Sequence, residues 1–260
     1  MCIIRIQYQE FDVDCVIFDK DGTLIEVDNF WVPRVQKWTD SIATSLNLKH
    51  EFKKDVFDLL GYSISQNHVR YESPLAVATL EALKVLMSGI ISQYGIPWHE
   101  ALALAERTAE ETIMADPNPN EIVSKGNILQ TMKKLVKAKA HNVIVTSDDR
   151  RLTEFTLSHL GITKLVSAII CGDDPIPNKP DPIAARTISE QLGISTSRMM
   201  MVGDSLTDMQ FANRAGIAFR IGVASTPEKK SLLAPHADAL VDSIDDFRIQ
   251  TKKKRQYLLP

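Results

Sequence analysis

Two carboxylates separated by one residue, Asp19 and Asp21, follow directly on a β-branched and aromatic run, Val13 to Phe18, which predicts a buried strand. In extended backbone their side chains point the same way. Because burying two unpaired carboxylates is costly, we expect both to lie where the strand emerges at its C-terminal end. Two like charges held together favour a bound cation, a shared proton or a role in phosphate transfer. The alternative is an ordinary surface turn, in which an Asp-Gly pair is common.

Polar side chains also follow three later apolar runs, at residues 143–145, 168–170 and 199–202. Taken singly, these clusters are ordinary helix caps, loops or turns. From residue 122 onward, however, apolar runs alternate with helical patterns, which predicts a parallel, doubly wound α/β sheet. The carboxyl ends of its strands would meet at one edge, where ligands bind. We therefore expect these side chains near Asp19 and Asp21: Thr146, Ser147, Lys179, Asp204, Ser205 and Asp208.

The chemistry of this expected cluster is that of phosphate transfer. Carboxylates without His or Cys ligands suit a hard, oxygen-seeking ion, Mg²⁺, which usually keeps water and a substrate phosphate among its ligands. A lysine and hydroxyls near helix starts suit a phosphate dianion. An aspartate can also attack phosphorus and form an aspartyl-phosphate.

A helical block separates the first strand from the rest of the sheet. Between residues 31 and 114, apolar residues recur at helical spacing and predict four helices, one of them from Leu75 to Tyr94. Short connections predict an antiparallel bundle, and the Pro- and Asn-rich stretch 116–120 predicts the return linker. We therefore predict an α/β core of residues 1–26 and 119–260 and an inserted helical domain of residues 27–118.

Composition narrows the class of protein. The 260 residues are 44% hydrophobic and carry a net charge of -3, which indicates a globular protein that has no general attraction for nucleic acid. No long apolar run or signal-peptide layout is present, so we expect no membrane partner. Scattered Cys2, Cys15 and Cys171 predict neither disulfide nor zinc site, and favour a reducing, cytoplasmic compartment. The basic run 252–255 predicts a solvated terminus, and the sequence carries no signal for an oligomeric state.

The whole set resembles the haloacid dehalogenase (HAD) superfamily, in its phosphatase branch. The run Asp19–Thr23 resembles the first motif of that family, Thr146-Ser147 the second, Lys179 the third and Gly203–Asp208 the fourth, in the same order. The helical block resembles the C1 cap of the family. Within it, the run 19–25 and the helix start 73–76 are most similar to phosphoglycolate-phosphatase-like proteins.

This resemblance implies a role for each residue. Asp19 would be the nucleophile on phosphorus, and Asp21 would protonate the leaving oxygen and then activate water. The carboxylates of Asp19 and Asp204 and the carbonyl of Asp21 would hold Mg²⁺. Asp208, with Ser205, would orient metal-bound water from behind these ligands. The transferred phosphoryl group would be held by Gly22, Thr146, Ser147 and Lys179.

Alternatives within the family differ in how well they fit. Dehalogenases lack the second aspartate of the first motif, so Asp21 argues against them. A phosphonatase needs a cap lysine for a Schiff base, and most cap lysines fall on expected solvated faces. A phosphomutase shares every motif seen here and stays open, as does a catalytically idle HAD-fold binding protein. Turnover of p-nitrophenyl phosphate with Mg²⁺ separates the enzyme from the idle protein.

The substrate is expected to be a small phosphorylated metabolite, a phosphoglycolate-like phosphomonoester, selected by the cap. Arg70 lies in a polar loop of the helical block, and its planar guanidinium suits a substrate carboxylate. The alternative is an exposed arginine that pairs with Glu72 or with nothing.

Overall fold

A computed structural model describes residues 2–48 and 50–251 of the chain. Six parallel strands form the central sheet in the order β10-β9-β8-β3-β6-β7. Their bounds are β3 Cys15–Phe18, β6 His141–Val145, β7 Val166–Ile170, β8 Met199–Gly203, β9 Phe219–Val223 and β10 Ala239–Val241. Five helices accompany them: α6 Ile128–Lys137, α7 Arg150–His159, α8 Ile183–Leu192, α9 Leu206–Arg214 and α10 Pro227–Leu233. The predicted doubly wound α/β sheet is confirmed.

Strand β3 lies inside the sheet, between β6 and β8, and is buried on both faces. Val16 and Phe18 pack in one hydrophobic cluster with residues of α6. Cys15 and Ile17 pack in a second cluster, which includes residues of α8 and α9. Because side chains alternate along a strand, this near-continuous apolar run fills both cores at once. The first polar side chain after it, Asp19, therefore lies at the edge of the sheet.

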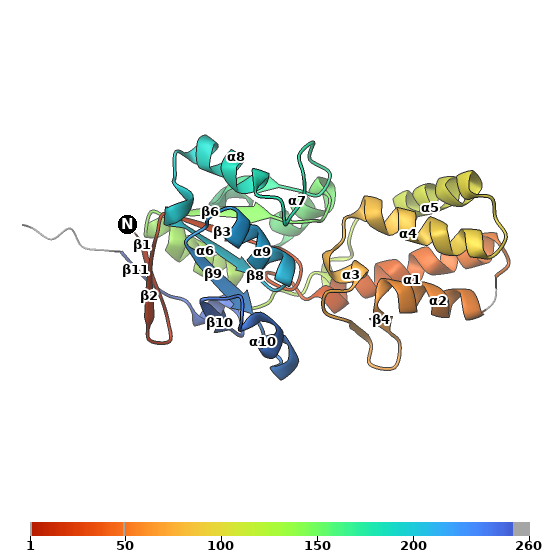
Figure 1. The fold of residues 1–260 in the computed structure, drawn as a ribbon, viewed down its shortest axis with the longest axis horizontal. Coiled ribbons are helices and arrows are strands. Elements are labelled where there is room, and N and C mark those ends of the chain that lie inside the picture. The colour runs from red at the N-terminus through yellow and green to blue at the C-terminus, as the bar shows by residue number, and fades with distance from the viewer. Residues whose placement is uncertain (1, 49, 252–260) are drawn as a thin grey trace, which may run out of the picture.

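A helical block is inserted between β3 and β6, as the sequence predicts. It contains α1 Val27–Ser45, α2 His50–Leu60, α3 Pro74–Val77, α4 Leu80–Gln93 and α5 Trp98–Thr112, with the short strands β4 Tyr62–Ser63 and β5 His68–Val69. In Figure 1 this block lies at the opposite end of the long axis from the α/β part. It has its own core, built around α1 and including the fully buried Trp38. The division into two domains at residues 26 and 119 stays a prediction.

The single helix predicted from Leu75 to Tyr94 is wrong. The chain leaves the helical conformation at Ala78 and Thr79, both extended, so that α3 and α4 are separate helices. Thr79 caps α4, since its Oγ1 accepts a hydrogen bond of 3.3 Å from the Ala82 N–H. Because the helical spacing of apolar residues continues across this break, the sequence pattern does not reveal it.

The strand predicted from Val13 to Phe18 is also divided. Val13 ends β2 (Gln9–Val13), which pairs antiparallel with β1 (Cys2–Ile6), and β11 (Arg248–Thr251) covers the other edge of β1. The break falls at Asp14, whose N–H donates to the Arg198 carbonyl at 2.9 Å and whose carboxylate accepts from the Arg198 guanidinium. An interaction between residues so distant in sequence leaves no local pattern.

Other expectations concern the chain as a whole. The three cysteines are free and buried. Within residues 2–48 and 50–251, no helix has the length and apolar character needed to span a membrane. Short 3₁₀ helices complete the fold: η1 Pro119–Glu121, η2 Thr163–Leu165, η3 Thr196–Arg198 and η4 Ile244–Asp246. The basic run 252–255 lies outside the described residues.

Candidate active site

Asp19 is placed by the pairing of β3 with β8. Its N–H donates to the Val202 carbonyl at 2.9 Å, so the ladder continues to the last residue before the site. Asp204 follows β8 and Thr146 follows β6, the two strands that flank β3. Parallel strands in register therefore bring three segments, far apart in sequence, to one edge.

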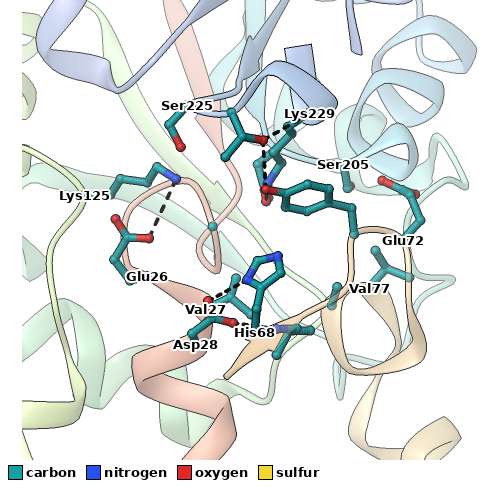
Figure 2. Close-up of a pocket in the computed structure, with 16 residues that line it drawn as sticks. Glu26, Val27, Asp28, His68, Glu72, Val77, Lys125, Ser205, Ser225 and Lys229 are labelled. Carbon is teal, nitrogen blue, oxygen red and sulfur yellow. Dashed lines mark hydrogen bonds and ion pairs between the residues drawn. The ribbon is translucent and has the colours of Figure 1, made fainter. Parts of the chain in front are cut away.

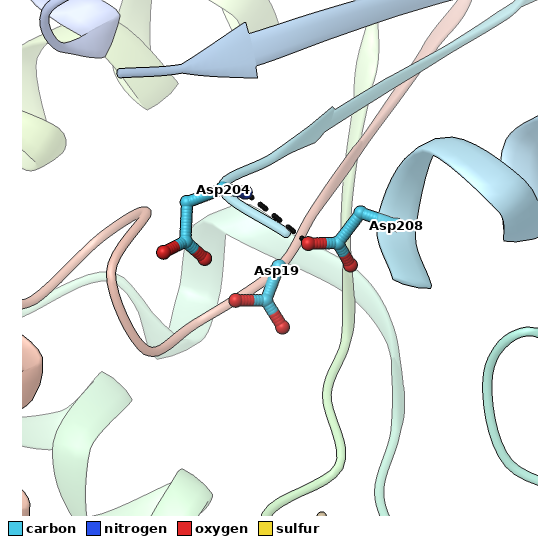
Figure 3. A group of neighbouring side chains, drawn as sticks. All are labelled: Asp19, Asp204 and Asp208. Atoms are coloured by element: carbon cyan, nitrogen blue, oxygen red, sulfur yellow. Dashed lines mark hydrogen bonds between the residues drawn. The ribbon is translucent and has the colours of Figure 1, made fainter. Parts of the chain in front are cut away.

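Three carboxylates, those of Asp19, Asp204 and Asp208, converge at this edge (Figure 3). One oxygen from each lies within 4.8 Å of the other two. All three side chains are nearly or fully buried. Burial, with repulsion from the neighbouring carboxylates, raises the pKa values of Asp19 and Asp204. A divalent cation would offset that repulsion, and a set of hard carboxylate oxygens fits Mg²⁺. The cluster can therefore hold a metal ion.

Lys179 supplies a buried positive charge beside Asp19, the predicted nucleophile. Its Nζ donates to Asp19 Oδ1 and to Asp208 Oδ1, both at 2.7 Å. Burial alone would lower the pKa of Lys179, but the two carboxylates hold it above its ordinary value. The lysine is therefore a fixed cation that a transferred phosphoryl group would meet at Asp19.

The second carboxylate oxygen of Asp208 accepts hydrogen bonds from residues at the start of α9. Its Oδ2 accepts from Ser205 Oγ at 2.7 Å, from the Ser205 N–H at 3.1 Å and from the Asp204 N–H at 3.2 Å. Ser205 Oγ in turn caps α9 by accepting from the Asp208 N–H. Asp208 and Ser205 thus fix the backbone that carries Asp204.

Asp21 is oriented by a buried lysine that we did not predict. Lys20 is fully buried and places Nζ 2.6 Å from Asp21 Oδ1 and 2.9 Å from Asp148 Oδ2. Burial alone would lower the pKa of Lys20, but the carboxylates of Asp148 and Asp21 raise it to about 12. The signal in the sequence is the position of Lys20 between two aspartates, since a lysine ammonium can pair with such carboxylates. Lys20 holds the Asp21 carboxylate in place.

Gly22 brings the loop after Asp21 against Asp204. Its φ of +81° lies in the left-handed region, and a Cβ there would lie 2.0 Å from Asp204 Oδ2. Only glycine permits both the turn and this approach. The structure places Gly22 beside the Asp204 carboxylate, and its predicted contact with phosphate stays a prediction.

Lys229, on α10, is a second cation that we did not predict. It is buried, and its Nζ contacts Asp204 Oδ2. The signal for this helix was Thr226-Pro227, since Thr226 caps α10 and Pro227 is its first residue. Nothing local in the sequence indicates that the helix directs Lys229 back toward Asp204.

Two adjoining cavities open at this edge. A narrow one of about 30 Å³ is lined by the predicted transfer residues, which are Asp19, Asp21, Thr146, Ser147, Lys179 and Asp204. A larger one of about 260 Å³ lies between the helical block and the α/β part (Figure 2). The two share Asp204, Ser205, Ala76 and Val77 in their walls.

The loop between β5 and α3 joins the helical block to the α/β part. Tyr71 Oη and Thr226 Oγ1 share a hydrogen bond of 2.9 Å. Glu72 Oε1 accepts from the Leu206 N–H at 2.9 Å, at the first turn of α9. Burial raises the pKa of Glu72 above its ordinary value, while this N–H lowers it. The loop therefore closes one side of the larger cavity.

Arg70 points elsewhere. Its Nη2 donates to the Asp58 carbonyl at 2.6 Å, its side chain is exposed, and it is not among the residues that line the two cavities. The Glu72 pairing considered from the sequence is replaced by this backbone contact. The structure therefore does not bring Arg70 to the site, whereas its neighbours His68 and Tyr71 do line the larger cavity.

Comparisons with known proteins agree with this geometry. A profile of haloacid dehalogenase-like hydrolases matches residues 13–216. The chain is 26% identical over 208 residues to the validoxylamine A 7'-phosphate phosphatase of Streptomyces hygroscopicus subsp. limoneus, covering 76% of this chain and 96% of that protein. It is 27% identical over 212 residues to the phosphoglycolate phosphatase of Shigella boydii serotype 4, with 79% of each covered. A crystal structure of a HAD phosphatase from Thermococcus onnurineus superposes with a TM-score of 0.60 at 18% identity, covering 90% of this chain and 95% of that one.

An α/β sheet with a helical insertion and acidic strand ends defines a class of phosphate-handling hydrolases. The chain belongs to the haloacid dehalogenase-like hydrolases. Its phosphatase relatives place it among the phosphoric monoester hydrolases.

Proposed function

We propose that this protein hydrolyses a small phosphomonoester in a Mg²⁺-dependent reaction through an aspartyl-phosphate on Asp19. The observation that carries the proposal is the position of Asp19. Its carboxylate touches the buried cation of Lys179 and shares a narrow cavity with Asp21 and Thr146. Groups suited to act as nucleophile, acid–base catalyst and phosphate-binding cation thus lie in one cavity, which supports the proposal.

The reaction runs in two halves. A carboxylate oxygen of Asp19 bonds to phosphorus as the bond to the leaving oxygen breaks, and Asp21 gives that oxygen its proton. Asp21 then takes a proton from water as the water oxygen bonds to phosphorus. Cleavage of the aspartyl–phosphate bond restores the Asp19 carboxylate and releases inorganic phosphate. Lys20, which contacts Asp21, keeps that carboxylate oriented in both halves.

Charge on the phosphoryl group is balanced by the surrounding residues. Lys179 offers its ammonium, while Thr146 and Ser147 offer hydroxyls and backbone groups at the end of β6. The carboxylates of Asp19 and Asp204 and the carbonyl of Asp21 would hold Mg²⁺, which would act as a Lewis acid and offset the repulsion between the anionic nucleophile and the anionic phosphate. Asp208 and Ser205 support Asp204 from behind.

The helical block, residues 27–118, serves as a cap that selects the substrate. Support comes from the larger cavity, whose walls combine cap residues such as Asp28 and Tyr71 with core residues such as Lys229. Phosphoglycolate, the substrate named for one relative, is the first metabolite to assay. We expect a small-molecule partner and neither nucleic acid nor a membrane.

Turnover of p-nitrophenyl phosphate tests the proposal. The wild type should release p-nitrophenol and inorganic phosphate in equal amounts with Mg²⁺. Asp19→Asn, which is nearly isosteric, should lower kcat by a factor on the order of a thousand or more. Asp116→Asn, an exposed carboxylate whose partner is Arg151, is the matched control. Asp19→Asn activity above roughly a tenth of wild type would reject the nucleophile.

The same assay separates the two alternatives. Transfer of the phosphoryl group to a second hydroxyl of a sugar phosphate, without release of inorganic phosphate, would identify a phosphomutase. No turnover of any phosphomonoester would indicate a binding protein with the fold of a phosphatase.

A further inference from the structure

We propose that the larger cavity binds the organic part of a polyhydroxylated phosphomonoester, of the sugar-phosphate or cyclitol-phosphate class. This inference rests on the proposed phosphatase function, which it deepens by naming the substrate class. Four properties of the cavity support it: its position, its size, its charge and its arrangement of donors and acceptors (Figure 2).

The larger cavity adjoins the expected site of phosphoryl transfer, where the leaving group of a substrate would lie. It shares Asp204 and Ser205 with the narrow cavity in which Asp19 and Lys179 lie. A substrate whose phosphoryl group lies at Asp19 can therefore extend past this shared wall into the larger cavity. Gly22 lines the larger cavity, without a side chain to obstruct the passage. The organic part of the substrate would enter the larger space.

The size exceeds that of a two-carbon acid. The cavity volume is about 260 Å³. At about 30 Å³ for each water in the liquid, this is room for roughly eight or nine waters. A glycolate group would leave most of that space to water, whereas a six-carbon polyol would displace most of it. Displacing water from a polar cavity favours binding only where the ligand replaces its hydrogen bonds.

The charge of the walls disfavours a second anionic group on the substrate. Four carboxylates line the cavity, those of Glu26, Asp28, Glu72 and Asp204. Each basic side chain that lines the larger cavity lies beside one of these carboxylates. Lys125 Nζ lies 3.8 Å from Glu26, Lys229 contacts Asp204, and His68 Nδ1 lies 2.8 Å from Asp28. A substrate carboxylate would compete with these partners and would meet Glu72 and Glu26 as like charges.

Paired charges are, by contrast, good partners for hydroxyl groups. A carboxylate that already accepts one hydrogen bond retains further lone pairs, and a hydroxyl can both donate to it and accept from an ammonium. Asp28 holds its position through two bonds, from the Val69 N–H at 2.7 Å and with His68 at 2.8 Å. The pair Glu26–Lys125 faces the cavity from another side (Figure 2). Vicinal hydroxyls fit such donor–acceptor pairs.

The remaining lining suits the carbon skeleton of such a ligand. Val27, Val77 and the Tyr71 ring contribute apolar surface between the polar pairs. The Tyr71 ring is also held by Lys229, whose Nζ lies 4.9 Å from its centroid. Rigid apolar faces combined with a few fixed polar groups are typical of sites for small ligands.

Substrate profiling of the whole protein with Mg²⁺ tests the inference. We would measure kcat/KM for glucose-6-phosphate, sorbitol-6-phosphate, myo-inositol-1-phosphate, phosphoglycolate and p-nitrophenyl phosphate. The best polyol phosphate should exceed phosphoglycolate by roughly tenfold or more, the value of one charge-assisted contact. If phosphoglycolate exceeds every polyol phosphate by that factor, the proposed class is wrong while the phosphatase function stands. If none of the five compounds is turned over, the proposed function fails, and this inference fails with it.

Two variants connect the preference to the cavity. Asp28→Asn and Lys125→Met should each lower, by roughly tenfold, the ratio of kcat/KM for the best polyol phosphate to that for p-nitrophenyl phosphate. The matched controls are Asp40→Asn, on the same helix as Asp28 but paired with Lys53, and Lys37→Met, whose side chain is exposed. They should leave the ratio unchanged. Thermal unfolding identifies any variant that fails to fold, in which case the other variant decides. An unchanged ratio in a folded variant would overturn the assignment.

Discussion

Tyr71 of the helical cap and Thr226 of the α/β part share a hydrogen bond of 2.9 Å between their hydroxyl groups. It lies at the wall of the larger cavity, directly before α10, the helix that carries Lys229. A polar bond between two parts joined by only two chain crossings stabilises their closed arrangement. We expect closure and substrate binding to be linked through this contact.

Tyr71→Phe should therefore raise KM for the best metabolite by roughly fivefold, because one neutral hydrogen bond contributes about 1 kcal/mol to closure. The ring stays in place, so kcat should change little. Tyr94→Phe is the matched control, since Tyr94 bonds to Asp55 within the cap. Steady-state kinetics on both variants measure the effect. An equal KM in Tyr71→Phe and wild type would show that the bond does not control closure.

Lys229 and the metal should compete for the same carboxylate. Lys229 neutralises Asp204 in the metal-free protein. Lys229→Met should lower the stability of the metal-free protein by about 3 kcal/mol, because it leaves a buried carboxylate without its cation. Mg²⁺ would then restore more stability to the variant than it adds to the wild type.

Thermal unfolding with and without Mg²⁺ measures this difference. Lys230→Met is the control, since the neighbouring Lys230 pairs with Asp242 on the surface and is half exposed. If Mg²⁺ raises Tm equally in Lys229→Met, Lys230→Met and wild type, then Lys229 and the metal do not share Asp204.

The metal itself should be replaceable only by ions of similar size. Ca²⁺ prefers more ligands at longer distances, which would move Asp19 away from phosphorus. We expect Ca²⁺ to support less than roughly a tenth of the Mg²⁺-dependent kcat, and excess chelator to abolish turnover. Hydrolysis of p-nitrophenyl phosphate after removal and re-addition of each ion measures this. Undiminished activity in chelator would exclude the metal-dependent reaction.

The amino-acid sequence predicts best the positions of residues that directly follow strands of the parallel sheet. Asp19, Thr146 and Asp204 follow neighbouring parallel strands. The carboxyl ends of such strands lie at one edge of the sheet, irrespective of the conformation of the loops. Apolar runs bounded by polar clusters reveal those strands, so the amino-acid sequence is enough to predict that the three residues converge. The chemical roles of these residues stay predictions.

Residues positioned by loops or by distant packing escape the same reasoning. Lys229 reaches Asp204 because α10 packs back against α9, the helix that follows Asp204. Arg70 is directed away from the site because its N–H bonds to the Gly61 carbonyl at 2.8 Å and its guanidinium to the Asp58 carbonyl. Asp148 has the sequence context of an ordinary helix cap, although it is buried against Lys20. Each of these contacts depends on how separate segments pack together, and the periodicity of apolar residues within one segment gives no information on that packing.

Asp149, at the start of α7, makes the pH dependence of stability testable. Burial, followed by repulsion from Asp148 and Asp173, raises its pKa from 3.8 to about 7. The unfolded chain releases this proton near pH 3.8, whereas the folded protein retains it up to about pH 7. Asp149 therefore contributes no pH dependence below the lower value, and lowers the stability progressively as the pH rises between the two values.

Asp149→Asn should remove that decline. The amide stays neutral at every pH, and asparagine is as good a residue as aspartate at a helix N-cap. The stability of the variant relative to wild type should rise between pH 4 and pH 7, the interval set by the two pKa values, and level off above it. The gain should be roughly 1 kcal/mol, since water screens a half-buried carboxylate. Urea unfolding of both proteins at several pH values measures the difference, with Asp40→Asn as an exposed control. A difference that is constant from pH 4 to pH 8 would contradict the raised pKa.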